Sequence, residues 1–91
     1  MKITEIIHVR LPAGMPTGLS EKIRKSISAE IPVEFFTILE RENLGSDLAV
    51  HIYRNDDNTQ SVPRQFGIHL VSSLKEYGLV DHTIWKELGS N

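Results

Sequence analysis

Cysteine is absent from this 91-residue chain. Its absence excludes disulfide bonds, thiolate metal ligands and a cysteine nucleophile, so the fold must be held together by packing or by association with another chain. Long apolar runs are also absent. Glu5, His8 and Arg10 interrupt the apolar amino terminus, which therefore lacks the continuous apolar stretch of a signal peptide. We expect a cytoplasmic protein with no membrane contact.

The chain also lacks an excess of positive charge. Ten Lys and Arg residues stand against twelve Asp and Glu residues, which gives a formal net charge of −2 and a pI near 6.0. This balance disfavours electrostatic binding to nucleic acid. A 40% apolar content and a mean hydropathy of −0.20 are typical of a folded globular chain. The length allows one domain, which we expect to span residues 1–91.

Periodicity predicts six elements. Alternating apolar residues predict strands at 3–11, 33–41, 47–54 and 79–88, and apolar residues at helical spacing predict helices at 17–30 and 62–77. Residues 42–46 offer a hairpin turn, residues 55–60 a polar connection and Ser61 a helix N-cap. The last segment could instead prolong the second helix, but we expect Gly78, in a left-handed conformation, to end that helix first.

The predicted order is strand-helix-strand-strand-helix-strand, the βαββαβ pattern of a ferredoxin-like α+β sandwich. In that fold both helices cover one face of a four-stranded antiparallel sheet, and the other face is usually polar. Here alternation places apolar and aromatic side chains on the helix-free face, together with two histidines and an arginine. The residues placed there are Ile6, His8, Arg10, Phe36, Ile38, Ala49, His51, Tyr53, Thr83 and Trp85.

This composition predicts an interface or a ligand surface, because large contiguous apolar areas are rare on monomers. We expect a homodimer or higher oligomer whose contact includes Ile6, Phe36, Ile38, Tyr53 and Trp85. Polar groups that converge among apolar ones are typical of small-molecule sites. We expect a small planar or anionic ligand to bind at His8, Arg10, His51, Tyr53 and Trp85.

No pattern in the sequence implies a cofactor or a catalytic residue. His8 and His51 would lie on neighbouring central strands, close enough to share a metal or a proton. Two imidazoles with no carboxylate nearby are an incomplete ligand set, so we predict no metal site. His82 is expected to face the helices as a half-buried, hydrogen-bonded side chain.

In topology and face composition the chain resembles the dimeric α+β-barrel families, in which two ferredoxin-like subunits oppose their sheets. That group includes small monooxygenases, haem-degrading enzymes and stress-response proteins, so the fold alone names no function. One hypothesis is a non-catalytic oligomeric binding or accessory protein. The alternative is a small monooxygenase-like enzyme in which His8 or His51 accepts a proton and Arg10 holds an anionic substrate. The lack of a carboxylate placed to orient either histidine favours the first hypothesis.

Overall fold

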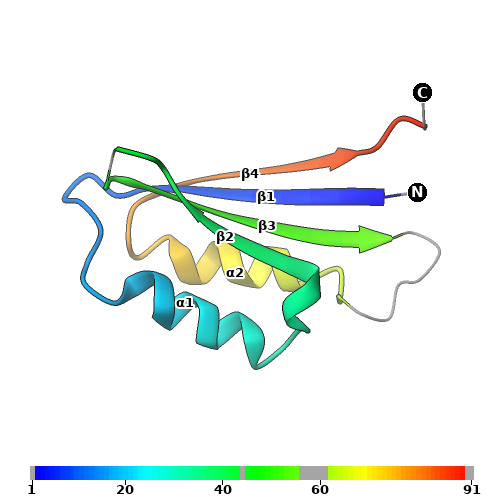
Figure 1. The fold of residues 1–91 in the computed structure, drawn as a ribbon, viewed down its shortest axis with the longest axis horizontal. Helices are drawn as coiled ribbons and strands as arrows, with labels where there is room; N and C mark the ends of the chain where they lie inside the picture. The colour runs from blue at the N-terminus through cyan, green and yellow to red at the C-terminus, as the bar shows by residue number, and fades with distance from the viewer. Residues whose placement is uncertain (1, 44, 56–61, 90–91) are drawn as a thin grey trace.

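A computed structural model describes residues 2–43, 45–55 and 62–89 (Figure 1). Within these ranges it has a four-stranded antiparallel sheet and two helices, which confirms the predicted α+β class. The strands are β1 (Lys2–Arg10), β2 (Phe36–Glu40), β3 (Asp47–Asn55) and β4 (Leu79–Lys86), in the order β2-β3-β1-β4. The helices α1 (Leu19–Ser28) and α2 (Phe66–Leu74) lie on the same side of the sheet. Leu44 of the predicted turn, residues 56–60 of the predicted connection and Ser61 lie outside the described residues.

The core lies between the sheet and the two helices. Alternate side chains of the central strands point into it, and Ile7, Val50 and Ile52 have no exposed surface. Complete burial of such a side chain stabilises the fold by about 1.5–3 kcal/mol. Each helix buries one apolar stripe at helical spacing, as the sequence predicts. The buried helix residues include Leu19, Ile23, Ile27, Phe66, Leu70 and Leu74. Neither described helix is long and apolar enough to cross a membrane.

The prediction of a strand over 33–41 is partly wrong. Val33–Phe35 form a short 3-10 helix, η1, entered from Pro32 with a φ of −62°. The strand therefore begins only at Phe36, which pairs with Ile52 and is 5% exposed. Phe36 and Ile38 point toward the helices and not to the helix-free face, so their placement in the predicted contact surface is wrong. When the alternation along a strand is displaced by one residue, every side chain of the strand moves to the other face of the sheet.

Position 78 requires glycine because a larger residue has no room there, and not because the backbone is left-handed. The φ of Gly78 is not positive, contrary to the sequence prediction. A Cβ atom at this position would overlap the carbonyl oxygen of Arg10, because the turn between α2 and β4 passes against the end of β1. The following segment is a strand, as predicted, and it ends at Lys86.

Candidate functional site

The strand register defines the face of the sheet that the helices leave uncovered. Thr4 on β1 lies opposite Tyr53 on β3 and opposite Trp85 on β4. Because opposed residues of antiparallel strands point to the same side, the register assigns every residue of the sheet to a face. The open face comprises Lys2, Thr4, Ile6, His8, Arg10, Thr37, Leu39, Asp47, Ala49, His51, Tyr53, Asn55, Leu79, Asp81, Thr83 and Trp85.

The predicted ligand residues all lie on the open face, but they form two groups. Tyr53 and Trp85 flank Thr4, whereas His8 and Arg10 lie four and six residues further along β1. A strand rises about 3.3 Å per residue, so His8 is about 13 Å from the aromatic row. The fold therefore does not bring Trp85 together with His8 or Arg10 in one small site.

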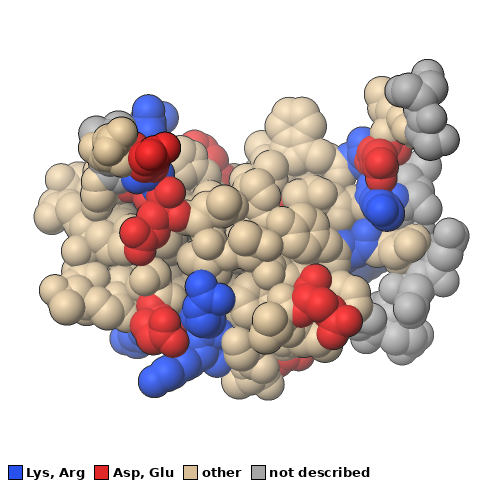
Figure 2. Space-filling model, in the orientation of Figure 1, with Lys and Arg blue, Asp and Glu red and all other residues tan. Residues whose placement is uncertain are grey.

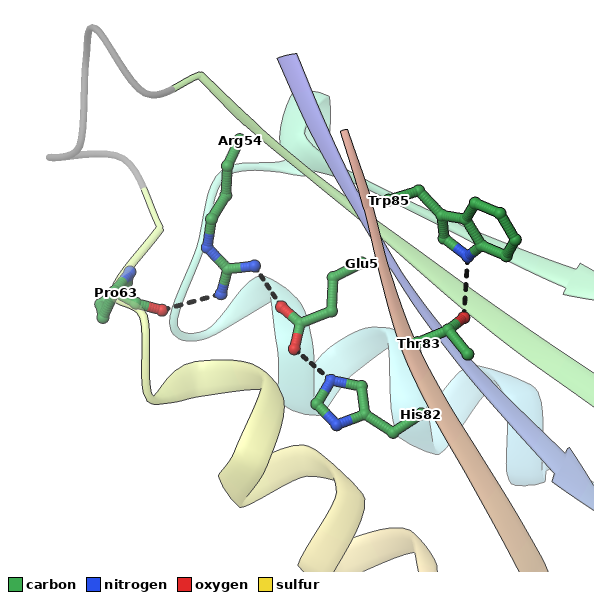
Figure 3. Close-up of polar contacts among 6 residues, drawn as sticks. All are labelled: Glu5, Arg54, Pro63, His82, Thr83 and Trp85. Atoms are coloured by element: carbon green, nitrogen blue, oxygen red, sulfur yellow. Dashed lines mark hydrogen bonds and ion pairs between the residues drawn. The ribbon is translucent and has the colours of Figure 1, made fainter. Parts of the chain in front are cut away.

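The aromatic group lies beside a hollow at one end of the sheet. The Tyr53 hydroxyl donates to Thr37 Oγ1 at 3.1 Å, and the Trp85 indole N–H donates to Thr83 Oγ1 at 2.9 Å (Figure 3). The hollow has a volume of about 520 Å³, and its lining includes Tyr53, Trp85, Thr4 and Lys2. This volume lies within the range of roughly 300–1,000 Å³ that small-molecule sites occupy.

The second group contains a carboxylate that the sequence interpretation overlooked. His8 Nε2 lies 2.7 Å from Oδ2 of Asp47, whose other oxygen accepts a hydrogen bond from Ser46. The expectation that neither histidine has a carboxylate to orient it is therefore wrong for His8. Asp47 has the same parity along β3 as Ala49 and His51, so alternation alone could have placed it on the open face. A hollow of about 290 Å³ opens beside His8 and Asp47.

The surroundings of Asp47 favour its ionised form. The hydrogen bond from Ser46 is the largest cause that lowers the pKa of Asp47, followed by the hydrogen bond with His8, while burial opposes the shift. Arg41 adds a favourable charge, with its Nη1 atom 3.5 Å from Asp47 Oδ2. A carboxylate that is ionised at neutral pH can only accept, so His8 donates from Nε2–H, and Nδ1 is the nitrogen that carries the lone pair when the ring is neutral.

Arg10 and His51 do not join this hydrogen-bonded group. Arg10 is exposed at the end of β1. Among the described residues no ion pair joins it to a carboxylate. The His51 ring instead meets the Tyr53 ring edge-on, with centroids 6.5 Å apart. His8 and His51 thus turn to different partners, and the described residues contain no group of three or more side chains suited to a metal ion.

A third polar group, on the helix side of the sheet, was not anticipated from the sequence. Glu5 is 2% exposed, and its carboxylate oxygens bind Arg54 Nη1 and His82 Nε2 (Figure 3). Arg54 also donates to the Pro63 carbonyl at 2.9 Å, just before α2. His82 is half-buried and hydrogen-bonded on the helix side, as predicted. The sequence did contain a signal for this group. Glu5 occupies a core-facing position of β1, and a buried carboxylate needs cationic partners.

Comparison with known proteins supplies no identity for this chain. It matches no protein-family model, no curated protein and no solved structure. Its function therefore has to be inferred from the open face itself.

Proposed function

We propose that this protein is a small oligomeric binding protein with a ferredoxin-like fold, in which the open face meets a second copy and holds a small planar or anionic molecule. The strand order and the placement of both helices on one side support the ferredoxin-like assignment. The sheet-to-sheet arrangement of the dimeric α+β-barrel families is one architectural parallel for such a contact.

The observation that carries the proposal is the apolar surface of the open face. Trp85 is 59% exposed and Leu39 is 41% exposed, and Ile6 and Tyr53 are half-buried between them. Large apolar side chains on a sheet face that no helix covers are typical of an interaction site. On the side shown in Figure 2, basic and acidic side chains are interspersed and form no single basic patch. This distribution is unfavourable for binding a nucleic acid on that side.

Ile6→Glu tests the dimer contact, because Ile6 is at the centre of the open face on β1. We expect light scattering to give at least twice the 10.3 kDa chain mass for the unmodified protein and a lower mass for Ile6→Glu. Val33→Glu is the matched control, since Val33 is 66% exposed on η1 and lies outside the open face. Equal masses for Ile6→Glu and Val33→Glu would reject the open face as the contact.

The ligand part of the proposal rests on the hollow beside Tyr53 and Trp85. Trp85 is the sole tryptophan, so its fluorescence reports binding at this position directly. We expect 2-naphthoate, a planar aromatic anion, to change the Trp85 emission saturably, and Tyr53→Leu to weaken binding several-fold through loss of an aromatic contact worth about 0.5–1.5 kcal/mol. Cyclohexanecarboxylate has the charge without the flat ring and is the control. Unchanged Trp85 emission at millimolar 2-naphthoate would contradict the proposal that a planar ligand binds beside Trp85.

The His8–Asp47 hydrogen bond favours a second candidate, a small α+β-barrel enzyme that uses a histidine as proton acceptor. An ionised Asp47 orients the ring and leaves Nδ1 of His8 to take a proton, and Arg10, two residues along the same face, can hold an anionic substrate. His51 contacts Tyr53, and no carboxylate bonds to it among the described residues. The hypothesis therefore names His8 as the base.

Proton exchange at the methyl group of pyruvate in D2O, followed by NMR, tests this second candidate. We expect His8→Gln to slow any exchange that the protein catalyses by about 10²–10⁴-fold and Asp47→Asn to slow it less. His69→Gln, at an exposed position of α2, is the control. Exchange at the same rate with and without protein, or full activity in His8→Gln, would reject the enzyme hypothesis.

A further inference from the structure

The outer strand β4 has a free edge that differs from the other edge of the sheet. β2, at the opposite edge, has only five residues and leads directly into the charged residues Arg41 and Glu42. β4 has eight residues and contains no proline. Short, charged edges are typical of protected sheets, and a long apolar edge invites another strand. Among the described residues, four of the seven large apolar side chains that are exposed lie on β4 or just after it: Leu79, Ile84, Trp85 and Leu88.

The direction of the backbone groups on β4 follows from one hydrogen bond. The Glu87 N–H donates to the Lys2 carbonyl at 2.8 Å, in the same register that pairs Ile3 with Lys86. Hydrogen-bonded residues alternate along an antiparallel strand, so residues 79, 81, 83 and 85 direct their N–H and C=O groups to β1. The alternate residues direct theirs to the free edge, where β4 pairs with no other described strand. These are Val80, His82, Ile84 and Lys86.

Each side of this edge exposes a large apolar side chain among polar ones such as Asp81 and Lys86. Ile84 is 65% exposed on the helix side, and Trp85 is 59% exposed on the open face. The edge strand therefore presents an exposed apolar side chain on each face of the sheet.

We propose that β4 pairs antiparallel with β4 of a second copy, which extends the sheet across a two-fold axis. An antiparallel strand is self-complementary in this arrangement, because the outward N–H and C=O groups of one copy meet those of the other. A second copy also brings its own exposed Ile84 and Trp85 to the contact, so each copy covers apolar side chains of the other. This contact uses the backbone edge and does not depend on the open-face contact.

Amide hydrogen exchange measured by NMR tests the edge pairing directly. We expect the amides of Val80, His82, Ile84 and Lys86 to exchange at least about tenfold more slowly in concentrated than in dilute protein. The amides of residues 79, 81, 83 and 85 are bonded to β1 in either state, so their exchange should not depend on concentration. Packing of the open faces protects no backbone amide in this alternating pattern, so the two contacts are distinguishable.

Two substitutions in β4 complete the test. Ile84→Pro removes an outward N–H without removing a bond to β1, and Ile84→Lys keeps the backbone intact and places a charge on the edge. Both should abolish the concentration dependence, whereas Ile6→Glu should retain it. Rapid exchange of the outward amides at every concentration would overturn the proposal, as would a concentration dependence that survives Ile84→Lys. A chain that stays at 10.3 kDa at millimolar concentration would also overturn it.

Discussion

At the residue scale, two buried carboxylates organise the two sides of the sheet. Glu5 is 2% exposed on the helix side, and Asp47 is 6% exposed on the open side. Each binds side chains from other segments, Arg54 and His82 in the first case and His8 and Arg41 in the second. An unpartnered buried carboxylate is strongly destabilising, so these residues are constrained together.

Asp47→Asn should remove a pH-dependent contribution to stability. The pKa of Asp47 in the folded protein lies below its ordinary value of 3.8, mainly because Ser46 and His8 hydrogen-bond to the carboxylate. Folding therefore favours the ionised form, and this contribution is present above the unfolded-state pKa and is lost as the pH falls through the folded-state pKa. We expect the Tm difference between the unmodified protein and Asp47→Asn to shrink below about pH 4. A difference that stays constant from neutral to acidic pH would contradict this assignment.

Gly67→Ala should destabilise the protein, although alanine normally stabilises a helix by about 1 kcal/mol relative to glycine. A Cβ atom at Gly67 would overlap the Glu5 carboxylate, which Arg54 and His82 hold in place. Overpacking of this kind costs about 1–3 kcal/mol. Ser72→Ala, at an exposed position of α2, is the control and should be neutral or slightly stabilising. Urea unfolding measures both, and a Gly67→Ala protein more stable than the unmodified chain would refute the close approach.

At the scale of elements, the sequence predicts a segment well where its apolar residues stand at alternate positions of a strand or along one side of a helix. Residues 3–11 and the stripe through Leu19, Ile23 and Ile27 meet this condition. Residues 33–41 do not meet it, because large apolar side chains occupy both odd-numbered and even-numbered positions there. The short helical turn after Pro32 determines which of the two sets faces the core. The predicted ligand residues fall into two groups because alternation assigns a residue to a face of the sheet but does not say which residues of neighbouring strands lie side by side.

Phe36→Ala and Leu39→Ala distinguish the observed parity of β2 from the opposite one. Phe36 is buried against the core, so its truncation should cost about 3–5 kcal/mol of unfolding free energy. Leu39 is 41% exposed on the open face and should cost clearly less. Guanidinium unfolding of both variants provides the comparison. A larger loss for Leu39→Ala would show that the strand presents its other side to the core.

At the scale of the whole molecule, the chain is a thin two-layer slab. Its extents are 40 × 30 × 19 Å. A small domain buries a limited fraction of its surface, so association adds appreciably to its stability. The open face and the β4 edge are the two surfaces through which the proposed contacts provide it.

Intermolecular NOEs in a mixture of isotope-labelled and unlabelled protein test the open-face contact most directly, because they identify the side chains that a second copy touches. We predict intermolecular NOEs at Ile6, Leu39 and Trp85 on the open face. NOEs at Ile6 are the decisive ones, since this residue is at the centre of the sheet and away from both edges. Intermolecular NOEs confined to the helices, or none at Ile6 under conditions in which the protein associates, would contradict the open-face contact.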